Sequence, residues 1–254
     1  MLQVERFDKI KDYLLKNEYA DIKDLADMLD ISTATVRRAL KHLEKEQVVD
    51  LTRGGAILAK RGSLYEYPYK IKQEINAEEK RRIARDAIQR IGRNESIFLD
   101  ASTTVCAMTQ FMLNLQDITV ATNDMNIAQN LINAEYLSVT LIGGTLRRHY
   151  YTLTGYFAET TLKDLCFDRA FLGIDAISLR GGLMITNIEE VQIKRKVISS
   201  SHEIIVLCDH SKFEQESFLN VCGCEDVNLI ITGKELDRKL YKKYTDAGLK
   251  IILV

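Results

Sequence analysis

Along residues 1–45, apolar residues recur with the period of helices. Val4–Leu15 and Ile22–Leu29 each place an apolar residue every three or four positions, which predicts one buried face per helix. Asp30-Ile31-Ser32 then breaks the pattern, and Ser32 is of a residue type that commonly caps a helix start. The apolar face of the next predicted helix consists of Val36, Leu40 and Leu43. The chain therefore opens with three predicted helices, the last two joined by a short turn.

The opposite face of this third helix is polar and basic. It carries Ala34, Arg38, Lys41, His42 and Lys45, flanked by Thr35 and Arg37. A helix that is buried on one side and basic on the other is what a helix-turn-helix presents to the major groove. An ordinary surface helix with a solvated basic face fits the same pattern, so this helix alone does not establish DNA binding.

Two such features follow. The segment Val48–Leu58 predicts a short β-hairpin whose apolar runs are separated by Arg53-Gly54-Gly55, with the glycines supplying the positive φ of a tight turn. Arg53 at its tip would contact phosphate or the minor groove, as a wing does. Residues 1–32 carry five basic and eight acidic side chains, whereas residues 33–61 carry seven basic and three acidic. Together these features favour DNA binding through Ser32, Thr33, Thr35, Arg37, Arg38, Lys41, His42, Arg53 and Gly54.

From residue 76 onwards the pattern changes. After a helical segment at 78–91, short β-branched apolar runs alternate with loops and helical segments, which predicts a mostly parallel sheet covered on both faces. The runs are residues 96–99, 118–121, 138–142, 170–172, 203–207, 228–231 and 250–254. We expect a DNA-binding domain at 1–58, an α/β domain at 76–254, and between them a linker at 59–75. That linker contains the only proline, Pro68, and the tyrosines Tyr65, Tyr67 and Tyr69, which could pack on the next domain.

Composition narrows the class of protein. The 254 residues are 46% hydrophobic and 28% charged with a net charge of −1, so any nucleic-acid contact must come from the local basic face. No secretory leader and no apolar run of about 18 residues is present, which favours a cytoplasmic protein. The five cysteines are odd in number, and Cys222-Gly223-Cys224 lacks a second Cys/His pair at ligand spacing. We expect no metal and no cofactor.

The loops after the predicted strands carry polar groups, and ligands of open α/β sheets bind at the carboxyl ends of strands. These loops contain Asp100 and Ser102-Thr103-Thr104, Thr122-Asn123-Asp124, Gly143-Gly144 with Arg147-Arg148, Gly173-Ile174-Asp175, and Asp209 with Lys212. Singly, each also fits an ordinary cap or turn. Together they predict a small, hydroxylated and phosphorylated ligand, and the absence of nucleotide-binding glycine motifs disfavours a nucleotide. Glu190 and Lys194 fit this site or a solvated i,i+4 ion pair equally well.

Nearly the whole chain resembles a known family. STATVRRALKHLEKEQVVDLTRGGA resembles the winged helix-turn-helix of the DeoR family of bacterial sugar-metabolism regulators. EKRRIARDA, FLDASTT, TNDMNIA, LIGGTLRR, FDRAFLGID, GGLMITNIEE and DHSKF follow in that family's order. The resemblance departs from the family pattern at Ala39 (usually Asp), Ser102 (usually Gly) and Tyr156 (often Pro).

The resemblance implies a sensor domain similar to ribose-5-phosphate isomerase, and repression of a sugar catabolic operon that a phosphorylated sugar relieves. It implies a phosphate loop of Asp100, Ser102, Thr103 and Thr104, with effector-site or structural roles for Asn123, Gly143, Gly144, Asp175, Glu190, Lys194, Asp209 and Lys212. Arg147 is a further candidate for a charged group of the ligand. We expect a homo-oligomer, dimer or tetramer, bound to double-stranded operator DNA. The alternative is an isomerase-like enzyme with an attached DNA-binding domain, in which Asp100, Asp175, Glu190 and Lys194 would supply acid/base chemistry.

Overall fold

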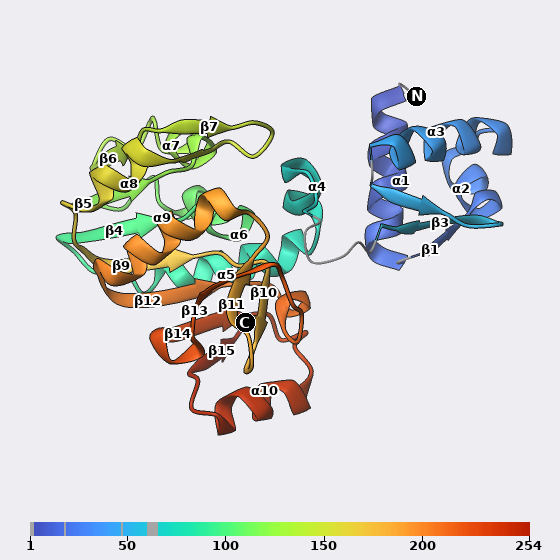
Figure 1. Cartoon of the computed structure of the whole chain (residues 1–254). Coiled ribbons are helices and arrows are strands. Elements are labelled where there is room, and N and C mark those ends of the chain that lie inside the picture. The colour runs from blue at the N-terminus through green and yellow to red at the C-terminus, as the bar shows by residue number, and fades with distance from the viewer. Residues whose placement is uncertain (1–2, 18, 47, 60–65) are drawn as a thin grey trace. The chain divides into compact units, whose positions relative to one another are not determined.

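The computed structural model describes residues 3–17, 19–46, 48–59 and 66–254 of the chain. The chain divides into two compact units, Met1–Ile75 and Asn76–Val254 (Figure 1). Each unit has its own hydrophobic core.

The first unit is a winged helix-turn-helix. Its helices are α1 (Gln3–Asn17), α2 (Ile22–Leu29) and α3 (Thr33–Lys45), as the apolar periodicity predicts. The side chains of Val4 and Leu15 lie outside the described residues. The predicted hairpin is present as β2 (Val49–Leu51) and β3 (Gly55–Leu58), and a third strand, β1 (Tyr19–Asp21), completes a sheet of order β1-β3-β2.

Gly55 has a different role from the one expected. Neither Gly54 nor Gly55 adopts a positive φ, so the prediction of a turn built on left-handed glycines is wrong. Gly55 instead pairs with Asp21 across the sheet, and a Cβ at Gly55 would lie 1.9 Å from the carbonyl oxygen of Ala20. The glycine is needed because β1, which the sequence did not reveal, passes directly against it.

The segment expected to be a linker contains a short helix, α4 (Tyr69–Glu74), preceded by Pro68 as its N-cap. Ile71 of α4 is 2% exposed and belongs to the core of the first unit, against which Tyr67 also packs. The hydroxyl of Tyr67 donates to the carbonyl of Ala59 at 3.0 Å. Tyr65 lies outside the described residues.

The second unit is built on a seven-stranded sheet of order β15-β14-β12-β9-β4-β5-β6. Every neighbouring pair of its strands is parallel, and the seven predicted apolar runs correspond to its seven strands. These are β4 (Glu95–Leu99), β5 (Ile118–Thr122), β6 (Leu137–Leu141), β9 (Phe167–Leu172), β12 (Ser201–Leu207), β14 (Leu229–Thr232) and β15 (Ile251–Leu253).

Helices cover both faces of this sheet (Figure 1). On one face, a core forms with α5 (Ala77–Ile88), α6 (Thr103–Cys106), the 3-10 helix η1 (Ala107–Phe111) and α7 (Met125–Asn130). On the other, a core forms with α8 (Tyr156–Leu162), α9 (Ile188–Ser199) and α10 (Arg238–Asp246). Consecutive residues of a strand point to opposite faces, so Phe98 joins one core and Ile97 and Leu99 join the other.

Smaller antiparallel elements border the main sheet. The hairpin of β7 (Thr145–Arg147) and β8 (Thr152–Thr154) follows β6, and β10 (Ala176–Ser178), β11 (Gly182–Ile185) and β13 (Leu219–Cys222) form a three-stranded sheet. Two further 3-10 turns are η2 (His210–Lys212) and η3 (Cys224–Asp226). Among the described residues, no helix has the length and apolar character that crossing a membrane would require.

Candidate functional site

The exposed face of α3 carries the predicted DNA contacts. Arg37, Arg38 and Lys41 are exposed, while Val36, Ala39, Leu40 and Leu43 are buried beneath them. Ser32 caps the helix, because its hydroxyl accepts from the backbone N–H of Thr35 at 3.2 Å. Ala39 is 3% exposed, so the position where the sequence departs from the family pattern lies in the core rather than on the basic face.

The other predicted DNA contacts have differing surroundings. Thr33, Arg53 and Gly54 are exposed, the latter two in the turn between β2 and β3. The ring of His42 stacks on Phe7 of α1 at 4.6 Å and 13°, and its Nε2 lies 3.1 Å from Glu46. His42 therefore helps to pack α3 on α1, in addition to any role at the surface.

In the second unit, a buried ion pair lies at the carboxyl end of β4. Asp100 and Lys194 are 2% and 3% exposed, and the ammonium of Lys194 donates to Oδ2 of Asp100. The same oxygen accepts from the N–H of Gly173 at 2.9 Å, and Lys194 also donates to the carbonyl of Gly173 at 2.9 Å. These bonds join the loops after β4 and β9 to α9.

The loop after β4 is held close to Gly173. Ser102 caps α6 by accepting from the N–H of Thr104 at 3.2 Å, and Thr103 and Thr104 are both buried. A Cβ at Gly173 would lie 2.2 Å from the side chain of Ser102, so only glycine permits this approach. The serine that departs from the family pattern is thus accommodated by the glycine opposite it.

Lys80 is a cation at this loop that the sequence interpretation missed. It is 5% exposed on α5, and its ammonium donates to the hydroxyl of Thr103 at 3.1 Å. A signal was present in the sequence, because Lys80 shares the inward face of its helix with Ile83, Ala84 and Ala87.

Asp209, after β12, is held in its charged form. Burial acts to raise its pKa, but the charges of Lys212 and Lys80, together with hydrogen bonds from Ser211 and Asn76, lower the pKa below its ordinary value. Oδ1 accepts from Asn76 at 2.9 Å and from the N–H of Ser211 at 3.1 Å. The loop therefore combines a buried carboxylate with Lys212, which is only partly buried.

Glu79, Asp209 and His210 place metal-ligand atoms within 4.8 Å of one another. Glu79 and His210 are already bonded, with His210 Nδ1 lying 2.7 Å from Glu79 Oε2 and the N–H of His210 lying 2.7 Å from Oε1. Burial raises the pKa of Glu79 despite these bonds. Because Lys80 and Lys212 already supply positive charge at Asp209, the group is better described as a network that ties α5 to the end of β12.

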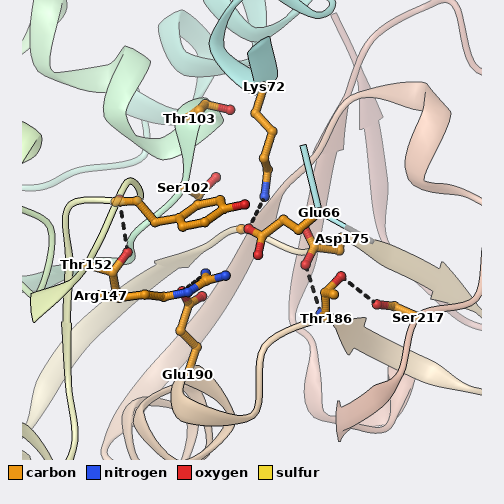
Figure 2. Close-up of polar contacts among 12 residues, drawn as sticks. Glu66, Lys72, Ser102, Thr103, Arg147, Thr152, Asp175, Thr186, Glu190 and Ser217 are labelled. Atoms are coloured by element: carbon orange, nitrogen blue, oxygen red, sulfur yellow. Dashed lines mark hydrogen bonds and ion pairs between the residues drawn. The ribbon is translucent and has the colours of Figure 1, made fainter. Parts of the chain in front are cut away.

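A second ion pair joins the β7–β8 hairpin to α9. Arg147 of β7 donates to Glu190 at 2.7 Å (Figure 2). Its guanidinium lies 3.8 Å from the ring centroid of Tyr150. Glu190 and Lys194 therefore have separate partners, and the interpretation of a solvated ion pair between them is wrong. Glu190 reaches Arg147 of β7, whereas Lys194 reaches Asp100 in the loop after β4.

Asp175, in the loop between β9 and β10, bonds to the residue that follows β11. Its Oδ2 accepts from the N–H of Thr186 at 3.0 Å, and the hydroxyls of Thr186 and Ser217 lie 3.1 Å apart (Figure 2). Gly143 and Gly144 lie between β6 and β7, and the backbone of Gly144 passes close to Thr154 of the hairpin.

The loop after β5 lies against the hairpin. The N–H of Leu153 donates to the carbonyl of Asn123 at 2.8 Å, and the side-chain amide of Asn123 donates back to the carbonyl of Leu153 at 3.1 Å. Burial raises the pKa of the neighbouring Asp124 to about 7, opposed by its hydrogen bonds from Ile127 and Asn126 and reinforced by the charges of Asp100 and Glu190. The sequence interpretation noted Asp124 within its loop without selecting it as a site residue.

Buried oxygen atoms without partners gather at this edge of the sheet. Among the described residues, such atoms include Oδ1 of Asn123 and Oδ2 of Asp124 after β5, Oδ2 of Asp209 after β12, and Oγ1 of Thr232 at the end of β14. Unpaired buried polar atoms are rare in proteins and costly, so each one calls for a water molecule or a ligand. Their clustering on strand ends marks this edge as the candidate ligand site.

Models of one protein family match both units of the chain. The model of the DeoR-like helix-turn-helix domain matches residues 6–61, and that of the DeoR C terminal sensor domain matches residues 75–234. The chain belongs to the DeoR family. This DeoR-family chain is therefore a DNA-binding transcriptional regulator, with a winged helix-turn-helix followed by a mostly parallel α/β sensor domain.

Individual relatives align with 92% or more of the DeoR-family chain. The HTH-type transcriptional repressor GlcR of Bacillus subtilis is 34% identical over 235 residues, or 92% of this chain and 90% of that protein. The glycerol-3-phosphate regulon repressor of Escherichia coli is 27% identical over 253 residues, covering all of both chains. Among solved structures, ribose 5-phosphate isomerase A of Methanocaldococcus jannaschii aligns with 54% of this chain and 55% of its own at 18% identity, with a TM-score of 0.41.

Proposed function

We propose that this regulator represses a sugar catabolic operon, and that a phosphorylated sugar relieves the repression by binding at the carboxyl edge of the sensor sheet. The observation that carries the proposal is the combination of buried cations and partnerless buried oxygens at the carboxyl edge of this one sheet. Such a mixture suits a ligand that has a phosphate at one end and hydroxyl groups at the other. The names of two relatives, a repressor and a glycerol-3-phosphate regulon repressor, support the same assignment.

In this proposal α3 lies in the major groove and the wing contacts the backbone. Arg37, Arg38 and Lys41 are the strongest candidates, since they are exposed on the side of α3 away from its buried residues. The full proposed set is Ser32, Thr33, Thr35, Arg37, Arg38, Lys41, His42, Arg53 and Gly54. Two copies of α3 are needed for two operator half-sites, so the protein would act as a homo-oligomer in the cytoplasm, where the operator is.

For the effector, Lys212 and Lys80 with the loop of Ser102, Thr103 and Thr104 form the phosphate end. The remaining proposed residues are Asp100, Asn123, Gly143, Gly144, Arg147, Asp175, Glu190, Lys194 and Asp209. Several of these already hold the loops together, so their roles combine structure with binding. The ligand would shift the protein away from its DNA-binding form only to the extent that it binds the other form more tightly.

A regulator fits the chain better than an isomerase with an attached DNA-binding domain. Relatives that align over the whole length are regulators, and Lys194 and Asp100, which would be needed for acid/base chemistry, are engaged with each other in a buried pair. Turnover of pentose or hexose phosphates by the purified protein would favour the enzyme instead.

The test is a DNA-release assay with a matched pair of variants. Fluorescence anisotropy would follow binding to DNA from upstream of the gene, in the presence of glycerol 3-phosphate, ribose 5-phosphate or glucose 6-phosphate. Lys212→Met should bind DNA as the wild type does, yet need at least about tenfold more sugar phosphate for release, because one charge-assisted phosphate contact is lost. Lys234→Met, which alters an exposed lysine after β14, should behave as the wild type does.

Two outcomes would contradict the proposal. If no phosphorylated sugar weakens DNA binding by the wild type, the effector class is wrong. If Lys212→Met and Lys234→Met respond alike, the phosphate end is misplaced.

A further inference from the structure

The side chain of Asp124 has one oxygen more than its place in the fold requires. It caps α7, and Oδ1 alone accepts both N–H groups, from Asn126 at 2.7 Å and from Ile127 at 3.1 Å. Ser32 and Ser102 cap α3 and α6 with a single hydroxyl oxygen each, so capping does not need a carboxylate. Oδ2 of Asp124 has no hydrogen-bond partner among the described residues, and the residue is 0% exposed.

The charges around Asp124 determine which kind of ligand group could form a hydrogen bond with its Oδ2. The carboxylates of Asp100 and Glu190 lie close enough to raise its pKa. Two cations on neighbouring elements, Lys194 of α9 and Arg147 of β7, are ion-paired with those same carboxylates. Three carboxyl groups against two paired cations make this place negative, which disfavours a phosphate, whereas a neutral hydroxyl can donate a hydrogen bond to Oδ2.

The β7–β8 hairpin packs against the strand end that carries Asp124. Asp124 forms a β-bridge with Thr152, and the N–H of Met125 donates to the carbonyl of Tyr151 at 2.9 Å. With Asn123 bonded to Leu153 as well, the backbone of the hairpin covers the strand end on which Asp124 lies. Because Asp124 is 0% exposed, a ligand group can reach its Oδ2 only when a packed neighbour moves, and the hairpin is one such neighbour.

We propose that Oδ2 of Asp124 accepts a hydrogen bond from a hydroxyl group of the phosphorylated sugar, so that Asp124 selects hydroxylated phosphate esters over inorganic phosphate. The inference rests on the proposed function and names the residue that recognises the sugar rather than its phosphate. Lys212 and Lys80 would bind the phosphate end of the phosphorylated sugar, and Asp124 would bind a hydroxyl at its opposite end.

Calorimetric titration with four probes tests this assignment. The probes are glycerol 3-phosphate, ribose 5-phosphate, glucose 6-phosphate and, as the probe without a sugar, inorganic phosphate. Asp124→Ser keeps a capping oxygen and removes the second one. It should bind the preferred sugar phosphate about 10- to 100-fold more weakly, while its affinity for inorganic phosphate stays unchanged.

The matched control is Asp237→Ser. Asp237 caps α10 through the same two kinds of bond, to the N–H groups of Lys239 at 2.8 Å and Leu240 at 3.3 Å, but it is exposed to solvent. This variant should bind all four probes as the wild type does. Thermal unfolding without ligand verifies that both variants are folded.

A second arm uses pH and Asp124→Asn, which keeps the size and the cap. With a pKa of about 7, the ionised fraction of Asp124 falls from about nine-tenths at pH 8 to about one-tenth at pH 6. Since the hydroxyl donates to the ionised form, wild-type affinity should fall about tenfold over this range relative to Asp124→Asn. The ligand phosphate and the other charged groups near Asp124, namely Asp100, Glu190, Lys194 and Arg147, are common to both proteins and cancel in the ratio.

The outcomes separate this inference from the proposed function. If no sugar phosphate binds the wild type, both fail. If one binds the wild type and Asp124→Ser with equal affinity, Asp124 has no part in recognition, while the proposed function stands. Equal weakening of sugar phosphate and inorganic phosphate would also overturn the inference, because it would place Asp124 at the phosphate end.

Discussion

The basic face of α3 and the carboxyl edge of the sensor sheet both depend on charged side chains, but they hold them differently. Arg37, Arg38 and Lys41 lie exposed on α3, above a separate apolar core. Lys194 and Asp100 are buried and joined to each other. Exposed charges remain hydrated and are available to a partner, whereas buried charges must be neutralised by the fold before any ligand arrives.

Binding and stability are therefore separable in the first unit, whereas in the second unit the same residues serve both. A charge on α3 can be removed with little effect on folding. A charge at the sensor edge holds loops from several strands together, so its removal affects the scaffold as well as the site.

The largest effect is expected for Lys194→Met. The change leaves Asp100 buried without its cation, which should lower the free energy of unfolding by about 3–5 kcal/mol. Urea denaturation would measure the loss, with Lys163→Met, at an exposed position after α8, as the control. A loss below about 1 kcal/mol would show that the pair contributes little and would break the contrast between the two regions.

The second-largest effect is expected for Arg38→Ala, and it concerns DNA affinity rather than the free energy of unfolding. Operator affinity should fall by about 1–3 kcal/mol if Arg38 contacts a base, with unfolding unchanged, and Lys41→Ala should weaken binding to all sequences alike. Anisotropy with operator and unrelated DNA distinguishes the two, and Arg93→Ala, which alters an exposed arginine of the sensor, serves as the control. Unchanged DNA affinity in both α3 variants would refute the assignment of this helix.

The smallest effect is expected where α3 begins. Ser32→Ala removes the hydroxyl that accepts from Thr35, which should destabilise the first unit by about 1 kcal/mol. Thr33→Ala, one residue further on, removes an exposed hydroxyl outside the capping bond and should change thermal unfolding less. Equal effects of the two would show that the cap is not what sets the start of the helix.

The sequence predicted the larger elements because their patterns are local. The seven runs of the parallel sheet and helices α1 to α3 follow from apolar periodicity and capping residues. The sequence did not predict the strands β1, β7, β8 and β10. Each has three residues, too few to show an alternation of apolar and polar positions, and each pairs with a strand that lies across a loop or far away in the chain. Gly55 was misinterpreted for the same reason, since its constraint comes from β1.

At the candidate site, the sequence predicted which loops carry polar side chains, but not which of these side chains bond to one another. Asp100 and Lys194 are separated by 94 positions, and only the folded sheet brings them together. The i,i+4 spacing of Glu190 and Lys194 suggested the wrong partner, because helix geometry alone does not show which loops lie nearby. That these residues bind a ligand remains a prediction.

The β7–β8 hairpin also affects how fast the regulator can respond. It is fastened at one place by Arg147 and Glu190 and at another by Leu153 and Asn123. If a sugar must wait for these bonds to open, its observed association rate should level off at high sugar concentration, at the opening rate of the hairpin. The opening of the hairpin would then set an upper limit on how fast the effector binds.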